Sequence, residues 1–138
     1  DDCLELKHKL DSIVATSGMR NKSTPLVESW QVASRLVIEE LEAWYFGDWT
    51  AVCAAYPCVT ANIPLQARYR DPDAIAGGTW EAFERILQRA GYFSTGLRKI
   101  EAARAIAAHW EPSRNTSRSF QTFCRCLYDI AQAPLHGA

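Results

Sequence analysis

Three carboxylates lie within four residues in the first half of the chain, namely Glu39, Glu40 and Glu42. Carboxylates this close repel one another unless a cation or an arginine neutralises them, and hard divalent ions prefer oxygen ligands. The spacing therefore indicates a candidate metal site. The alternative is a solvated helix start, because glutamate is favoured in the first turn of a helix.

Basic side chains form a second candidate group toward the C-terminal end. Lys99, Arg104, Arg114 and Arg118 fall in the last two expected helices and their connection, and Ser117 and Ser119 flank Arg118 at a helix start. Free backbone N–H groups, two hydroxyls and a guanidinium at such a start suit a phosphate group. The same residues would also form an ordinary helix N-cap.

Other catalytic arrangements are missing from the sequence. None of the three histidines has a partner at metal-ligand spacing, and there is no glycine-rich phosphate loop or nucleophile elbow. Five cysteines at irregular spacing argue against a disulfide framework and for a reducing cytoplasm. Cys124 and Cys126 point about 200° apart on an expected helix, so they cannot share one zinc ion.

Length and composition indicate one globular domain over residues 1–138. Of the 138 residues, 48% are hydrophobic and 22% are charged. The formal net charge of −1 gives no global basic field, although 1–63 is the acidic part and 64–138 the arginine-rich part. No apolar run has the length of a membrane span and no signal-peptide pattern is present. We therefore expect a cytoplasmic protein without a membrane segment.

The elements that must position these groups are mostly helical. Apolar residues recur at helical spacing along most of the chain, and helix-start residues such as Asp48 and Thr79 precede two of the repeats. Helices are expected over residues 3–17, 39–46, 49–56, 79–90, 99–109 and 120–130.

One strand is expected, over residues 31–38. The continuous apolar run Leu36, Val37 and Ile38 suits a strand covered on both faces, as in a parallel sheet flanked by helices. The three glutamates would follow its carboxyl end, where α/β sheets usually bind ligands. A lone strand leaves its backbone groups unpaired, so we expect partner strands before Asp1 or in another chain. The predicted fold class is α/β, predominantly helical, with few strands.

Several segments match a known family in order and spacing over nearly the whole chain. They are residues 35–48, 62, 70–73, 77–81, 99, 103–106, 115 and 117–120. Together they resemble a prokaryotic family of unknown function, domain of unknown function 4276. The most specific marks are Glu-Leu-Glu-Ala-Trp at 40–44 and Ser-Arg-Ser-Phe at 117–120.

The resemblance implies a Toprim-like domain of which this chain is the C-terminal portion. An early glutamate and an Asp-x-Asp strand end of that family are missing here, and Asp2-Cys3 resembles the pair that opens the next helix. It further implies that Asp2, Glu40 and Glu42 lie at a Mg²⁺ ion, with Glu40 and Glu42 catalytic in phosphodiester transfer or hydrolysis. The implied phosphate-holding residues are Lys99, Arg104 and Arg118.

Such proteins are related to nuclease domains of overcoming-lysogenization-defect proteins and are often encoded beside an ATPase. The resemblance thus implies a Mg²⁺-dependent nuclease or phosphotransfer role on nucleic acid, in defence with an ATPase partner, and the fragment alone is expected to be inactive. The alternative is a non-catalytic module that docks on the ATPase or forms a homo-oligomer. Five Trp and five Tyr would supply anchors for such a surface.

Overall fold

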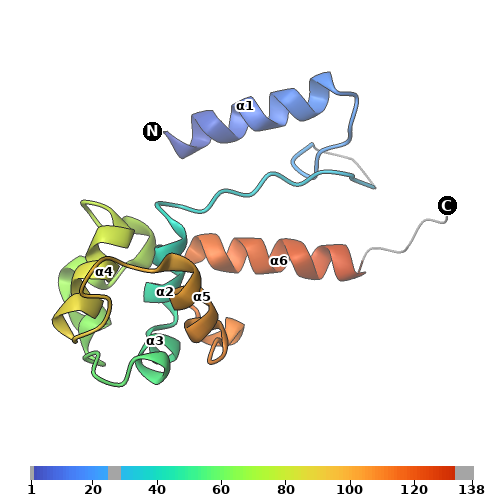
Figure 1. Cartoon of the computed structure of the whole chain (residues 1–138). Helices are drawn as coiled ribbons and strands as arrows, with labels where there is room; N and C mark the ends of the chain where they lie inside the picture. Colours follow the sequence, from blue (N-terminus) through green and yellow to red (C-terminus); the bar gives the residue numbers. More distant parts are fainter. Residues whose placement is uncertain (1, 25–28, 133–138) are drawn as a thin grey trace. The chain divides into compact units, whose positions relative to one another are not determined.

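The computed structural model describes residues 2–24 and 29–132, and its regular structure is helical (Figure 1). This confirms the predicted predominance of helix. Within the described ranges, no helix is long and apolar enough to cross a membrane. The α-helices are α1 (Cys3–Thr16), α2 (Leu41–Gly47), α3 (Trp49–Ala55), α4 (Thr79–Arg89), α5 (Lys99–Ala107) and α6 (Arg118–Gln132). Short 3₁₀ turns are η1 (Ile63–Leu65), η2 (Ala67–Tyr69), η3 (Pro72–Ala74) and η4 (Pro112–Arg114).

The strand predicted over residues 31–38 is wrong. In the described residues this segment forms one isolated parallel bridge, between Val32 and Asn21, and no ladder. Val37 is 40% exposed, so the apolar run is not covered on both faces. A strand requires a neighbouring strand to pair with its backbone hydrogen-bonding groups, and residues 2–24 and 29–132 contain none. The described residues are therefore helical rather than α/β.

The chain divides into two compact units, which are described separately. Unit 1 contains the described residues up to Leu36 and from Arg125 onward, and unit 2 contains Val37–Cys124. The single domain expected over residues 1–138 stays a prediction.

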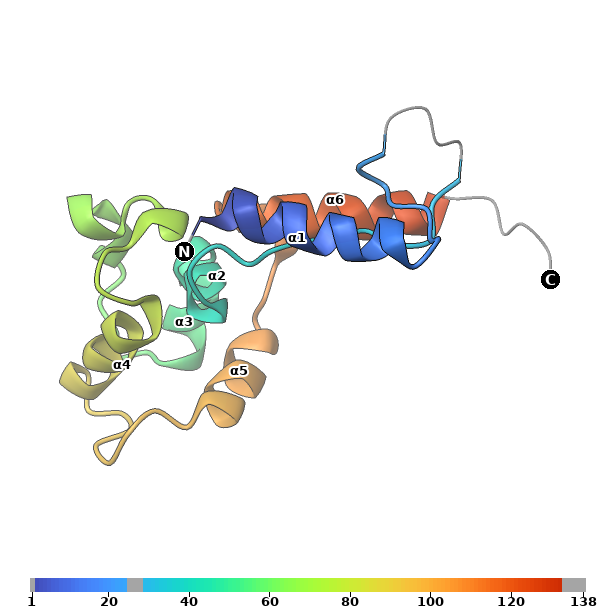
Figure 2. The same ribbon diagram turned by 90° about the horizontal axis from the view of Figure 1, so that it is seen from above.

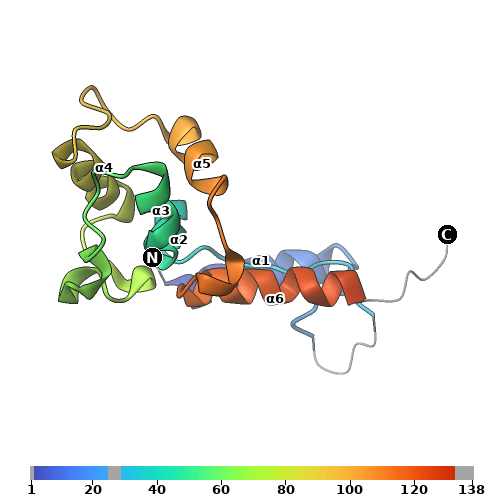
Figure 3. The ribbon, with the colours of Figure 1, turned by 90° about the horizontal axis from the view of Figure 1, so that it is seen from below.

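Unit 2 is built around an aromatic core. Figures 2 and 3 show α2 and α3 lying between α4 and α5. The Phe46 ring stacks on Trp49 at 5.2 Å and on Tyr69 at 5.3 Å between centroids, and Phe83 meets Phe46 edge-on. Most of these aromatic side chains are buried, so they stabilise the fold and are not available as surface anchors.

Unit 1 is held mainly by polar contacts. Asp2 caps α1 by accepting a hydrogen bond from the Leu4 N–H at 2.8 Å. Farther along α1, Asp11 accepts from Lys7 at 2.9 Å and from the amide of the buried Asn21 at 2.7 Å. The loop after α1 is thus tied to the helix by one carboxylate.

Candidate functional site

Glu40, the first candidate metal ligand, lies at the N-terminus of α4. Its Oε2 accepts hydrogen bonds from the Thr79 hydroxyl at 3.0 Å and from the Trp80 backbone N–H at 2.8 Å. The N-cap position of α4 is Gly78, which has no side chain to serve as a cap, so the predicted role of Thr79 as N-cap is wrong. A carboxylate from 40 residues away in the chain satisfies this helix end instead.

Glu42, the second candidate, is buried in α2. Its side chain is 5% exposed, and its Oε1 lies 3.5 Å from the ammonium of Lys99, which is 55% exposed. The same ammonium lies 4.8 Å from the centre of the Trp80 ring. A buried carboxylate requires such a cation, because burial otherwise disfavours its charge. Burial, with a smaller contribution from the charge of Glu42, raises the pKa of Tyr45 to about 12.

The structure therefore joins Glu40, Glu42 and Lys99 into one cluster around Trp80. The sequence analysis assigned Lys99 to phosphate and the glutamates to metal, whereas here the lysine faces one of those glutamates. Asp2, the third predicted ligand, belongs to unit 1 and is engaged as a helix cap. No group of three His, Cys, Asp or Glu side chains in the described ranges is arranged to hold a metal. As arranged, these residues do not form a Mg²⁺ cage, and the metal role stays a prediction.

Ser117 and Ser119, the predicted phosphate ligands, bind the carboxylate of Asp73. The Asp73 Oδ1 accepts from the Ser117 hydroxyl at 2.8 Å and from the Ser119 hydroxyl at 2.9 Å, and Oδ2 accepts from the Ser119 N–H at 3.0 Å. The Trp44 indole N–H donates to the Ser119 hydroxyl at 2.9 Å. An anion thus lies at the start of α6, as helix polarity favours, but it comes from η3 of the same chain.

The other predicted phosphate ligands are free of such contacts. Arg104 on α5 and Arg118 at the start of α6 are exposed, and neither has a carboxylate within ion-pair distance among the described residues. The structure therefore brings Ser117 and Ser119 together with Asp73, and leaves both guanidinium groups facing solvent.

Asp48, predicted only as the N-cap of α3, also holds a buried ion pair. It caps the Ala51 N–H and is 1% exposed, so the predicted cap is confirmed. Its two oxygens also face the Arg114 guanidinium, with Nε–Oδ1 and Nη2–Oδ2 distances of 3.1 Å each. The Glu111 backbone N–H donates to Oδ2 at 2.9 Å. A bidentate pair of this kind fixes the loop before α6 onto the α2–α3 junction.

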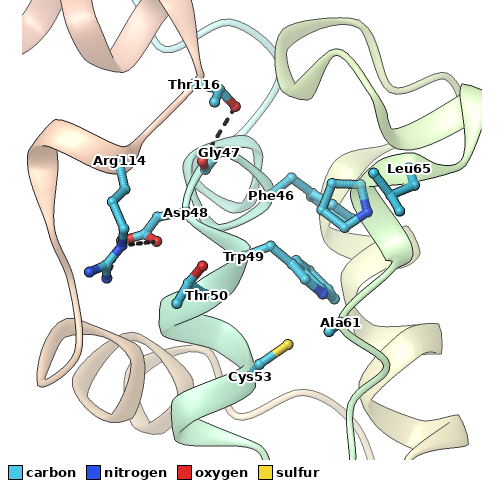
Figure 4. A pocket seen from close by; sticks show the side chains of 11 residues that line it. Phe46, Gly47, Asp48, Trp49, Thr50, Cys53, Ala61, Leu65, Arg114 and Thr116 are labelled. Carbon is cyan, nitrogen blue, oxygen red and sulfur yellow. Dashed lines mark hydrogen bonds and ion pairs between the residues drawn. The ribbon is translucent and has the colours of Figure 1, made fainter.

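A cavity of about 460 Å³ lies at this junction. Figure 4 shows Arg114 beside Asp48 on one flank, and Phe46, Trp49 and Leu65 on the other. Apolar surface with one guanidinium fixed by Asp48 suits the binding of a small ligand. Burial raises the pKa of the Cys53 thiol on the cavity wall, which favours the unreactive protonated form.

Sequence reasoning missed Asp73 and the Asp48–Arg114 pair. Asp73 lies in the segment 70–73 that contributed to the family resemblance, but no role was assigned to it. No local pattern indicated its role, because Asp73 lies more than 40 residues from Ser117 and Ser119 in the sequence. Asp48 was recognised through local capping alone, since its partner Arg114 is 66 residues away.

Comparisons with known proteins give one result. The family model for a domain of unknown function, DUF4276, matches residues 3–128 of the chain. Comparison with curated proteins and with solved structures gave no match.

Proposed function

Since the chain belongs to the DUF4276 family of domains of unknown function, we propose that it is the nucleic-acid-binding portion of a Toprim-like protein. The supporting observation is an imbalance in unit 2. Its carboxylates are mostly engaged by internal donors, whereas most of its arginines are exposed and have no carboxylate partner in the described ranges. The arginines concerned are Arg68, Arg70, Arg85, Arg89, Arg104 and Arg118.

The formal net charge near zero does not reveal these exposed arginines, because it counts carboxylates that are engaged by internal donors. Glu40, Asp48 and Asp73 each accept hydrogen bonds at the start of a helix, and Glu84 accepts from the Leu97 N–H at 2.6 Å. Arg114 neutralises Asp48, whereas the other three carboxylates keep their charges but are held by internal N–H and O–H donors and do not pair with the exposed arginines of the described ranges. The free guanidinium groups remain available to solvent anions, and their fork geometry matches phosphate oxygens.

Salt-dependent oligonucleotide binding tests this proposal. We expect labelled single-stranded or double-stranded oligonucleotide to bind at low salt, with an affinity that falls steeply as salt rises. Arg104→Gln and Arg118→Gln should each reduce the salt slope by about one. The matched control is Arg98→Gln, because Arg98 already pairs with Glu101 at 2.5 Å and should contribute little. No binding at low salt would contradict the proposal.

Mg²⁺-dependent nuclease or phosphotransfer activity, in defence beside an ATPase, is the finer proposal and rests on the resemblance alone. Its test is calorimetric titration of the full-length gene product with Mg²⁺ or Mn²⁺, compared with its Glu40→Gln and Glu42→Gln variants. Loss of binding heat in either variant would support metal ligation by these carboxylates. A full-length wild type that binds neither ion would contradict the metal role and leave nucleic-acid binding standing.

A second candidate function is a protein-interaction module, favoured by unit 1. Leu6 and Ile13 lie seven residues apart on one face of α1 and are 46% and 61% exposed. Such a face fits a second copy of the chain or an ATPase partner. We expect sedimentation of the wild type to show concentration-dependent association that Leu6→Gln with Ile13→Gln abolishes. A monomer at every concentration would exclude the homo-oligomer.

A further inference from the structure

A cavity separate from the clusters above lies between η2, η3 and α4. Its volume is about 280 Å³. The lining includes the side chains of Tyr69, Ile75 and Ala82, each at most 5% exposed. Arg68 and Arg85 also line it. The cavity thus combines an apolar floor with two guanidinium groups.

Neither arginine is neutralised by a neighbour. Among the described residues, no carboxylate lies within ion-pair distance of Arg68 or Arg85. Asp71, the carboxylate that also lines the cavity, accepts a hydrogen bond from the Asp73 N–H at 3.1 Å in capping η3. Two cations at one cavity repel each other, so an anion placed between them is stabilised by both.

The position of Arg68 is partly fixed by an aromatic ring. Its guanidinium carbon lies 4.5 Å from the centre of the Tyr69 ring, and that ring is buried. Ala82 lies three residues before Arg85 on α4, so its small side chain leaves room beside the second guanidinium. Less side-chain freedom is therefore lost when a ligand binds than at a fully mobile surface arginine.

From this geometry we propose that the cavity binds a phosphate group and the organic part attached to it, as in one nucleotide unit. The phosphate lies between Arg68 and Arg85, and the attached sugar or base packs on Ile75 and Ala82. This inference rests on the proposed nucleic-acid binding and specifies where one phosphate is held. The phosphate can belong to a free nucleotide or to a nucleic-acid chain.

The test compares the double variant Arg68→Gln with Arg85→Gln against the double variant Arg98→Gln with Arg125→Gln, which removes the same number of charges. Arg98 pairs with Glu101 and Arg125 is exposed on α6, and neither lines the cavity, so this double variant is the matched control. The probes are adenosine monophosphate, adenosine as the uncharged control, and a short single-stranded DNA oligonucleotide. We expect the cavity variant to lose phosphate-dependent affinity by about tenfold or more, and the control variant to lose much less.

The probes separate the two sources of phosphate. Loss of adenosine monophosphate binding identifies a free-nucleotide site, whereas loss confined to the oligonucleotide identifies a chain phosphate. Equal losses in the two double variants, or no loss in either, would overturn the cavity site. In that case, salt-dependent oligonucleotide binding by the wild type would leave the proposed function standing. A wild type that binds no probe overturns both.

A substitution that fills the cavity tests the site without removing a charge. Ala74 is exposed on η3 and lines the cavity, so Ala74→Leu occupies its space and preserves both guanidinium groups. We expect the same loss of affinity, with unchanged circular dichroism. Wild-type affinity in Ala74→Leu would contradict the packing of the sugar or base in the cavity.

Discussion

Units 1 and 2 both contain helices with apolar residues at helical spacing, but they bury these residues to different extents. Unit 2 buries a continuous aromatic cluster around Phe46 and Phe83. In the described part of unit 1, the buried side chains are Val14, Asn21 and Cys126, and most large exposed apolar side chains of the described ranges belong to this unit. Helical spacing of apolar residues therefore predicts a helix in both units, but it does not reveal whether the apolar face is covered.

The two units also differ in how helix ends are satisfied. In unit 1, Asp2 caps the helix that directly follows it. In unit 2, α4 and α6 receive carboxylates from Glu40 and Asp73, which are distant in the chain. Long-range capping ties elements of unit 2 together, whereas the cap in unit 1 stabilises one helix only.

Removing a side chain from the core should give the largest difference in stability loss between the two units. Phe83→Ala deletes a fully buried side chain that contacts three other aromatic rings, and should lower the free energy of unfolding by about 3–5 kcal/mol. Ile13→Ala in unit 1 truncates a 61% exposed side chain and should change the free energy of unfolding by less than about 0.5 kcal/mol. Urea unfolding measures both, and similar losses would contradict the difference in core.

Breaking the buried ion pair should have the next largest effect. Asp48→Asn leaves Arg114 without its carboxylate partner and weakens the cap of α3, at a cost of about 2 kcal/mol because Arg114 is partly exposed. Glu101→Gln, which breaks the exposed pair with Arg98, should cost less than about 0.5 kcal/mol. Thermal unfolding of the two variants gives the comparison, and equal shifts would show that the burial of Asp48 adds nothing.

Substitutions at two adjacent glycines before α4 should have a smaller effect on stability, and the two positions can be compared directly. Gly77 and Gly78 both have left-handed φ angles, of 81° and 85°. A side chain at Gly78 would also collide with the Glu81 carboxylate, whereas the space at Gly77 is open. Gly77→Ala should cost about 1 kcal/mol and Gly78→Ala about 1 kcal/mol more. Equal unfolding midpoints in urea would show that Glu81 moves aside freely.

The smallest expected effect is a pH dependence of α1 in unit 1. The hydrogen bond from Lys7, helped by Asn21, lowers the pKa of Asp11 below its usual value of 3.8. The carboxylate therefore contributes stability above that value, and the contribution is lost as pH falls through the lowered pKa. The protection of α1 amides against hydrogen exchange, taken relative to the intrinsic exchange rate at each pH, should decrease in this range, and Asp11→Asn should remove this pH dependence. An unchanged profile in the variant would contradict this assignment.

Local patterns in the sequence predicted most helices but not the strand. Periodicity located α1, α4, α5 and α6 to within a few residues, because each carries its own apolar stripe. The run Leu36, Val37 and Ile38 has strand-like residues, yet a strand also requires a neighbour to pair with, which no local pattern supplies.

The candidate site was predicted less completely for the same reason. Glu40 and Glu42 are neighbours in sequence, but Glu40 has extended backbone before α2 and Glu42 lies inside the helix, so their carboxylates meet different partners. Those partners, Thr79 and Lys99, become neighbours only once the chain has folded. Residue types alone indicated chemistry here, while the actual contacts depend on the tertiary arrangement.

Asp73 occupies the hydrogen-bond donors at the start of α6 and would compete with any phosphate for them. Because this carboxylate belongs to the same chain, its effective concentration at the Ser117 and Ser119 donors is of millimolar order or higher, and any external phosphate must displace it. Weak phosphate binding at the start of α6 would then reflect competition by the Asp73 carboxylate, not a lack of suitable donors. A substitution that shortens or removes the Asp73 side chain would act as a gain-of-binding mutation.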